Sequence, residues 1–120
     1  MIRILIVDDH SDIRRLLSIT LGKDFEILEA EDAASALDAV RRHHPTIVLL
    51  DVMMPGKMNG LDALAEIKAS PQTQDILVAM ISARGQVSDH DEARKLGADA
   101  YFVKPFSPLQ VAAWVRSKVA

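Results

Sequence analysis

The chain has 120 residues, a length that forms one hydrophobic core rather than two. Hydrophobic residues make up 49% of it and charged residues 26%, which excludes a disordered chain, because such chains bury too little apolar surface to offset the entropy lost on folding. The formal charge of -3 argues against direct nucleic-acid binding, and the absence of cysteine excludes disulfides, thiolate metal sites and cysteine nucleophiles.

Membrane insertion is not expected either. The longest apolar runs, such as Ile47–Leu50, are far shorter than the roughly 20 residues that span a bilayer. The N-terminal stretch lacks the long apolar segment and small-residue cleavage site of a signal peptide. We therefore expect a cytoplasmic protein made of one domain over residues 1–120.

Short runs rich in Ile, Val and Leu recur along the chain, each bounded by polar or turn residues. Runs of this length and composition predict β-strands, several of them buried on both faces. In chain order the predicted strands are Ile2–Val7, Ile27–Glu29, Ile47–Leu50, Ile76–Ile81 and Ala100–Val103.

A segment with helical periodicity follows each predicted strand. The first runs from Ser11, as N-cap, to Gly22. The second has Asp32 as N-cap and ends before Pro45, because proline disfavours the helical conformation in the residue before it. The remaining helices are expected over Leu61–Lys68, over Val87–Leu96 before Gly97, and from Pro108 with Ser107 as N-cap.

Strands that alternate with helices predict an α/β fold with a doubly wound parallel sheet, because parallel neighbours need crossover connections. In such a sheet the working crevice lies outside the carboxyl ends of the strands. Polar side chains that could work as a unit follow four of the predicted strands: Asp8, Asp9, Asp51, Ser82 and Lys104.

This set of residues favours metal-assisted phosphoryl chemistry. Carboxylates held close together repel one another unless a cation compensates, and an all-oxygen ligand set favours a hard cation such as Mg²⁺. With the cation bound, an ionised carboxylate can attack a phosphoryl group to give an aspartyl phosphate. Lys104 would place a positive charge near the transferring oxygens.

The sequence assigns no catalytic histidine. His10 lies beside the acidic pair and could be a metal ligand or general base, but an isolated histidine near a helix start is more commonly a capping or surface residue. Met53 and Met54 are expected to pack in a loop, because thioethers suit soft metals.

Four motifs together resemble the receiver domain of two-component response regulators: Ile4–Asp9, Asp51–Gly56, Ser82–Ala83 and Lys104–Phe106. The likeness in order and spacing covers essentially the whole chain. It implies a flavodoxin-like, five-stranded sheet of order 2-1-3-4-5, with helices one and five on one face and helices two, three and four on the other.

The resemblance also assigns roles to individual residues. Asp51 resembles the phosphoacceptor, and Asp8, Asp9, Asp51 and the backbone carbonyl of Met53 resemble the Mg²⁺ site, with Asp8 acting mainly through water. Ser82 resembles the switch hydroxyl and Tyr101 the switch aromatic. Lys104 resembles the phosphate-binding lysine, followed by a cis bond to Pro105.

The function that this resemblance implies is a signalling switch and not an enzyme with an external substrate. A sensor histidine kinase or phosphotransfer protein would supply the phosphoryl group from a phosphohistidine. A downstream protein would bind the face made by the fourth helix, fifth strand and fifth helix. The loop after Asp51 is one residue longer than the family pattern, which leaves the position of Lys57 relative to the site open.

Other functions are disfavoured by particular positions. A small aspartyl-phosphate phosphatase resembling the haloacid dehalogenases would have an aspartate two residues after the nucleophile, where this chain has Met53. A pseudo-receiver would lack part of the polar set, which is intact here. A nucleotide-binding function has even less support from the sequence, because neither Gly-x-Gly-x-x-Gly nor a Gly-Lys-Ser/Thr loop is present.

Overall fold

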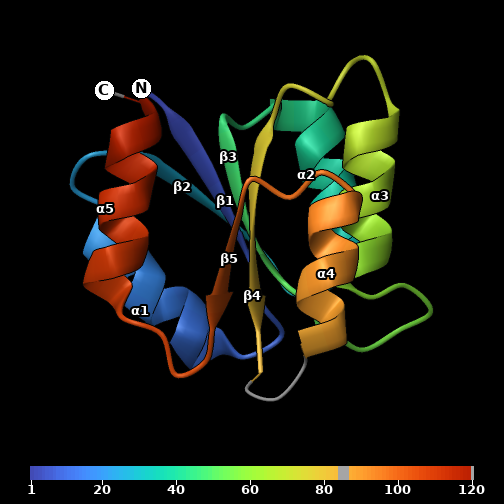
Figure 1. Cartoon of the computed structure of the whole chain (residues 1–120). Helices are drawn as coiled ribbons and strands as arrows, with labels where there is room; N and C mark the ends of the chain where they lie inside the picture. Colours follow the sequence, from blue (N-terminus) through green and yellow to red (C-terminus); the bar gives the residue numbers. More distant parts are fainter. Residues whose placement is uncertain (84–86, 120) are drawn as a thin grey trace.

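The computed structural model describes residues 1–83 and 87–119, and for residues 87–89 only the backbone. Strands and helices alternate along the chain (Figure 1). In order they are β1 Arg3–Val7, α1 Ser11–Leu21, β2 Glu26–Ala30, α2 Ala33–His43, β3 Ile47–Asp51, α3 Gly60–Ala69, β4 Leu77–Ser82, α4 Val87–Lys95, β5 Ala100–Val103 and α5 Pro108–Val119. Within the described part of the chain, no helix is both long and apolar enough to cross a membrane.

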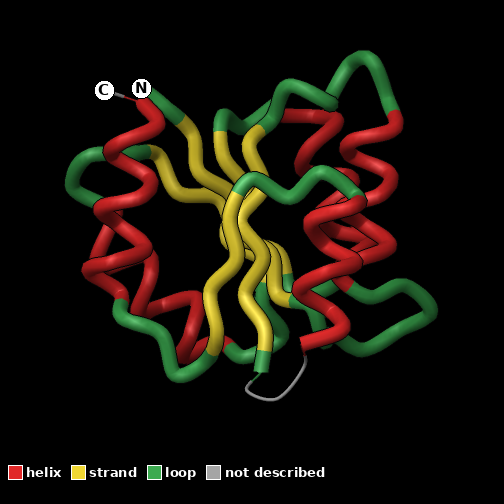
Figure 2. Tube along the Cα trace, viewed as in Figure 1, coloured by secondary structure: helices red, strands yellow, loops and turns green. Residues whose placement is uncertain are grey.

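The strands form one parallel sheet of order β2-β1-β3-β4-β5, which confirms the doubly wound fold expected from the sequence (Figure 2). Val7 of β1 is in register with Leu50 of β3, and Asp51 of β3 with Ile81 of β4. This register brings the carboxyl ends of the strands together at one edge, where the polar residues follow.

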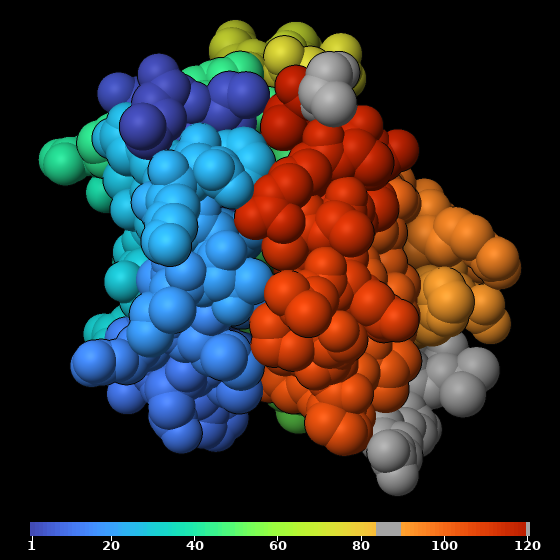
Figure 3. Space-filling model, turned by 90° about the vertical axis from the view of Figure 1, so that its left-hand side faces the viewer, coloured from blue at the N-terminus to red at the C-terminus, as the bar shows by residue number. Residues whose placement is uncertain are grey.

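Alternating side chains of the central strands point into two separate cores, because successive residues of a strand face opposite sides of the sheet. Ile4 and Ile6 of β1 pack with α1 and α5 in one core, and Leu5 and Val7 pack with α2, α3 and α4 in the other. Figure 3 shows α1 and α5 side by side over the first face. The predicted distribution of helices over the two faces is therefore confirmed.

Most predicted helix ends are confirmed. The Asp32 carboxylate accepts a hydrogen bond from the Ser35 N–H at 2.8 Å, as expected of an N-cap. The Ser107 hydroxyl accepts one from the Gln110 N–H at 3.2 Å at the start of α5. Helix α2 ends at His43, and His44 takes a left-handed conformation with φ of 44° before Pro45.

The predicted N-cap of the first helix was wrong by one residue. His10, not Ser11, is the N-cap of α1, and its backbone is extended at φ -91° and ψ 113°. The reason is a turn that the preceding aspartate makes, because the Asp8 carboxylate accepts the His10 N–H at 2.9 Å. The chain therefore enters the helix one residue earlier.

Three strands extend one residue beyond their predicted ends, to Ala30, Asp51 and Ser82. Helix α3 begins directly against the end of β3, because Asn59 and Asp62 form a capping box and the Gly60 N–H donates to the Val52 carbonyl at 2.8 Å. A Cβ at Gly60 would clash with the Asp51 carbonyl oxygen. The absence of a side chain at Gly60 thus lets α3 approach the backbone of Asp51.

The close approach at Gly60 predicts that Gly60→Ala lowers the free energy of unfolding by about 1–3 kcal/mol, because backbone must shift to accept the methyl group. Helix propensity alone would favour alanine over glycine by about 1 kcal/mol, so the sign of the change separates the two effects. Chemical denaturation measures it, and a stabilised variant would contradict the steric argument.

Candidate functional site

Three predicted site residues from three strands meet at the carboxyl edge of the sheet. Asp8 directly follows β1, Asp51 ends β3 and Lys104 directly follows β5. The Lys104 Nζ lies 3.2 Å from Asp8 Oδ2 and 3.5 Å from Asp51 Oδ2. The Lys104–Pro105 peptide bond is cis, as expected. The structure therefore brings the lysine between two carboxylates that lie far apart in the sequence.

Local contacts hold the end of β1 in place. Asp8 is buried, and its carbonyl accepts a hydrogen bond from Arg14 Nη1 at 2.6 Å. The same guanidinium pairs with Glu29 of β2 through Nε at 3.0 Å. Arg14 of α1 thus links the ends of β1 and β2, a role that the sequence analysis did not assign.

Burial governs the electrostatics of Asp51, of which only 3% is exposed. Burial, and then the negative charge of Asp8, raise the pKa of Asp51 from 3.8 to about 6, although Lys104 and the backbone N–H of Met53 act in the opposite direction. Burial alone would lower the pKa of Lys104, but the charges of Asp51 and Asp8 outweigh it and raise that pKa. One lysine therefore leaves the carboxylates undercompensated, and an added cation would favour their ionised forms.

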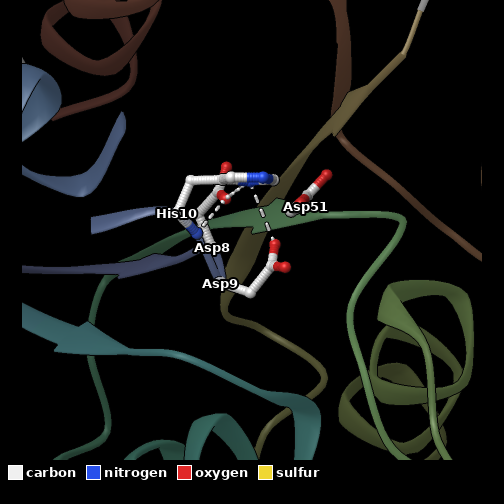
Figure 4. Close-up of side chains that lie close together, drawn as sticks. All are labelled: Asp8, Asp9, His10 and Asp51. Atoms are coloured by element: carbon white, nitrogen blue, oxygen red, sulfur yellow. Dashed lines mark hydrogen bonds and ion pairs between the residues drawn. The ribbon is translucent and has the colours of Figure 1, made fainter. Parts of the chain in front are cut away.

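His10 is exposed at the start of α1, as expected of a capping or surface residue, but its side chain also takes part in the carboxylate cluster. Its backbone occupies the N-cap position of α1, but its side chain makes no capping hydrogen bond. The Nδ1 atom instead lies 3.1 Å from Asp8 Oδ1 and 3.2 Å from Asp9 Oδ1, and the Asp51 side chain lies beside them (Figure 4). The position of His10 next to two aspartates was the only signal in the sequence.

The loop between β3 and α3 packs through its methionines. Met54 is partly buried against the α2–α3–α4 core, as expected, and so is Met58. The expectation that Met53 also packs in the loop was wrong, because its side chain is exposed. Lys57 lies in an exposed part of this loop, next to Gly56 with φ of 104°. The added loop length is thus taken up at the surface.

The two predicted switch residues lie on adjacent strands. Ser82 is fully buried at the end of β4, and its hydroxyl donates to the Ala83 carbonyl at 3.2 Å. Tyr101 of β5 is half-buried and stacks on His90 of α4, with ring centroids 4.3 Å apart and planes at 11°. Tyr101 therefore faces α4, as the alternation of side chains along β5 predicts.

Comparisons with known proteins agree with this geometry. The family model for the response regulator receiver domain matches residues 4–116. The chain is 44% identical over 115 residues to the "Probable transcriptional regulator ycf27" of Galdieria sulphuraria, covering 95% of this chain and 44% of that protein. It is 37% identical over 116 residues to the phosphate regulon transcriptional regulatory protein PhoB of Escherichia coli strain K12, covering 96% of this chain and 50% of that protein.

Solved structures give the same picture. The chemotaxis response regulator CheY4 of Vibrio cholerae superposes with a TM-score of 0.88 at 26% identity, covering 98% of each chain. The receiver domain of NtrX from Brucella abortus superposes with a TM-score of 0.87 at 35% identity, covering 95% of each chain. The chain spans about half the length of the curated relatives it matches.

The raised pKa of Asp51 predicts a pH-dependent cost to stability. A carboxyl group whose pKa is higher in the folded state favours folding when protonated, and this contribution is lost as the pH rises from about 4 through about 6. Without metal and above pH 6, Asp51→Asn should therefore raise the free energy of unfolding by about 1–3 kcal/mol. The lower end of this energy range allows for solvent screening.

Chemical denaturation over a pH series with a chelator measures this effect. The matched control is Asp38→Asn, which removes an exposed carboxylate on α2 and should show no such pH profile. Equal stability of wild type and Asp51→Asn across the series would contradict the burial argument.

Proposed function

Because the chain belongs to the response regulator receiver domain family, we propose that it is a signalling switch whose Asp51 accepts a phosphoryl group from a phosphohistidine. The donor is a sensor histidine kinase or a phosphotransfer protein. The observation that carries the proposal is the buried Asp51 carboxylate with Lys104 Nζ at 3.5 Å and a second buried carboxylate, Asp8, on the same lysine.

The transfer proceeds by attack of an Asp51 carboxylate oxygen on phosphorus. The phosphorus–nitrogen bond to the donor histidine breaks, its electron pair stays on the imidazole, and an acyl phosphate forms on Asp51. Lys104 lies where it can neutralise charge on the phosphoryl oxygens. Later attack by water releases inorganic phosphate and restores the carboxylate.

The donor set fits Mg²⁺, because oxygen ligands from several carboxylates suit a hard cation. Asp9 and Asp51 would hold the ion directly, together with the Met53 backbone carbonyl. Asp8 would act mainly through water, which is supported by its two oxygens already accepting hydrogen bonds from the His10 N–H and Lys104 Nζ. When bound, the cation supplies charge neutralisation for the attacking carboxylate and the phosphoryl oxygens.

Phosphorylation of Asp51 would change the positions of the Ser82 and Tyr101 side chains. The phosphoryl group offers charged acceptors, which make stronger hydrogen bonds than neutral ones, and so draws the Ser82 hydroxyl away from the Ala83 carbonyl. Tyr101 then turns inward and leaves its stack on His90. This movement changes the surface of α4, β5 and α5, where we propose that a partner protein binds.

An external phosphatase substrate is disfavoured because the position of its general acid is the exposed thioether of Met53. A pseudo-receiver would share the fold but not the chemistry. The two remaining functions, switch and pseudo-receiver, differ in whether Asp51 becomes phosphorylated.

Incubation with Mg²⁺ and acetyl phosphate should add one phosphoryl group to the wild-type chain, as measured by intact mass. Asp51→Asn should gain none, whereas the surface control Asp38→Asn should behave as wild type. Lys104→Ala should still accept the group from this small donor but fail to change its partner surface. An unmodified wild-type chain would favour the pseudo-receiver, and modification of Asp51→Asn would contradict the assigned phosphoacceptor.

The switch itself predicts a structural change on binding beryllofluoride, which mimics the phosphoryl group. In paired structures without and with the mimic, the Ser82 hydroxyl should move toward the mimic and the Tyr101 ring should leave its position 4.3 Å from His90. An unmoved Ser82 and an intact Tyr101–His90 stack would reject this mechanism while leaving the phosphorylation chemistry in place.

A further inference from the structure

The His10 ring has no function in the chemistry proposed above, although it lies within the site. Its side chain is 63% exposed and does not cap α1. Its backbone is fixed, because the N–H donates to Asp8 Oδ1 at 2.9 Å. The ring is therefore held at the exposed side of the site, with its Nδ1 atom directed at the carboxylates of Asp8 and Asp9.

We propose that His10 Nδ1 is a ligand for divalent transition-metal cations at this site, and that it makes the site prefer such cations over Mg²⁺ more strongly than its carboxylates alone would. The inference rests on the proposed function, because it uses the same cation site. It adds to that function a residue that determines which cation binds.

The spacing of the donor atoms supports this role. Octahedral ligands at about 2.1 Å from a small divalent cation lie about 3.0 Å from their neighbours. His10 Nδ1 lies 3.1 Å from Asp8 Oδ1 and 3.2 Å from Asp9 Oδ1. One ligand atom from each of Asp8, Asp9, His10 and Asp51 lies within 4.8 Å of all the others. Small side-chain adjustments would place the atoms of Asp9, His10 and Asp51 in one coordination shell, with Asp8 acting mainly through water as proposed above.

The position of Lys104 leaves this space open. Its Nζ contacts the Oδ2 atoms of Asp8 and Asp51, whereas His10 faces the Oδ1 atoms of Asp8 and Asp9. The lysine and the imidazole thus approach Asp8 through different oxygens. A cation beside His10 does not have to displace the lysine.

The chemistry of the donors determines the selectivity. Carboxylate and carbonyl oxygens suit Mg²⁺, whereas an imidazole nitrogen suits Ni²⁺, Zn²⁺ and Fe²⁺. A carboxylate-only site already binds Ni²⁺ more tightly than Mg²⁺ because of the general affinity order of divalent metals. The contribution of His10 is therefore the part of the Ni²⁺ to Mg²⁺ affinity ratio that disappears when the imidazole is removed.

Calorimetric titration of the full chain with Ni²⁺ and with Mg²⁺, at one fixed pH, measures this ratio. The variants are His10→Ala and His10→Asn, of which the second keeps an N–H donor for the carboxylates but has no imidazole nitrogen. Both should lower the ratio by about tenfold or more. The control His43→Ala removes an exposed histidine at the end of α2 and should leave the ratio for this site unchanged.

An unchanged ratio in His10→Asn, or a higher Ni²⁺ affinity in either His10 variant, would overturn the proposal, because the ring would then only hydrogen-bond to the carboxylates. Proton NMR of the Co²⁺-loaded chain gives a second readout, in which the His10 ring protons should show contact shifts. Failure of the proposed function would be seen in a separate measurement: the intact mass of the wild-type chain would not increase after incubation with acetyl phosphate and Mg²⁺.

Discussion

Two buried carboxylates share one lysine at the edge of the sheet, and much of the site depends on this arrangement. Asp8 and Asp51 both contact Lys104 Nζ, within 3.2 and 3.5 Å. Buried charge is costly unless it is paired and hydrogen-bonded. Because one ammonium group faces two carboxylates, the pKa of Asp51 stays raised. Binding of a further cation at the site is therefore electrostatically favourable.

The parallel sheet makes this arrangement possible. Its central strands are buried on both faces, so their side chains are fixed by packing and their carboxyl ends are held in register. The connecting segments then secure the edge: Arg14 links β1 to β2, and Gly60 brings α3 against the backbone of Asp51. The site is thus positioned by a rigid core and by contacts that leave its mouth accessible.

Neighbouring residues of β5 connect the site to two different surfaces. Tyr101 stacks on His90 of α4, whereas Phe102 packs edge-to-face against Trp114 of α5, with centroids 6.3 Å apart. Because Lys104 directly follows the same strand, β5 links the site residues to both of these contacts. Trp114 is therefore a packing residue and not part of the Tyr101 contact.

The sequence by itself determined the order of elements, the doubly wound fold and the polar residues of the site, because apolar runs, helical periodicity and the positions of strand ends are local features of the chain. Its motifs also identified the family. Only the tertiary structure decided the N-cap of α1, the link through Arg14, the Tyr101–His90 stack and the place of His10 among the carboxylates. These features depend on distances between side chains from different elements, and such distances are set by how the helices pack on the sheet.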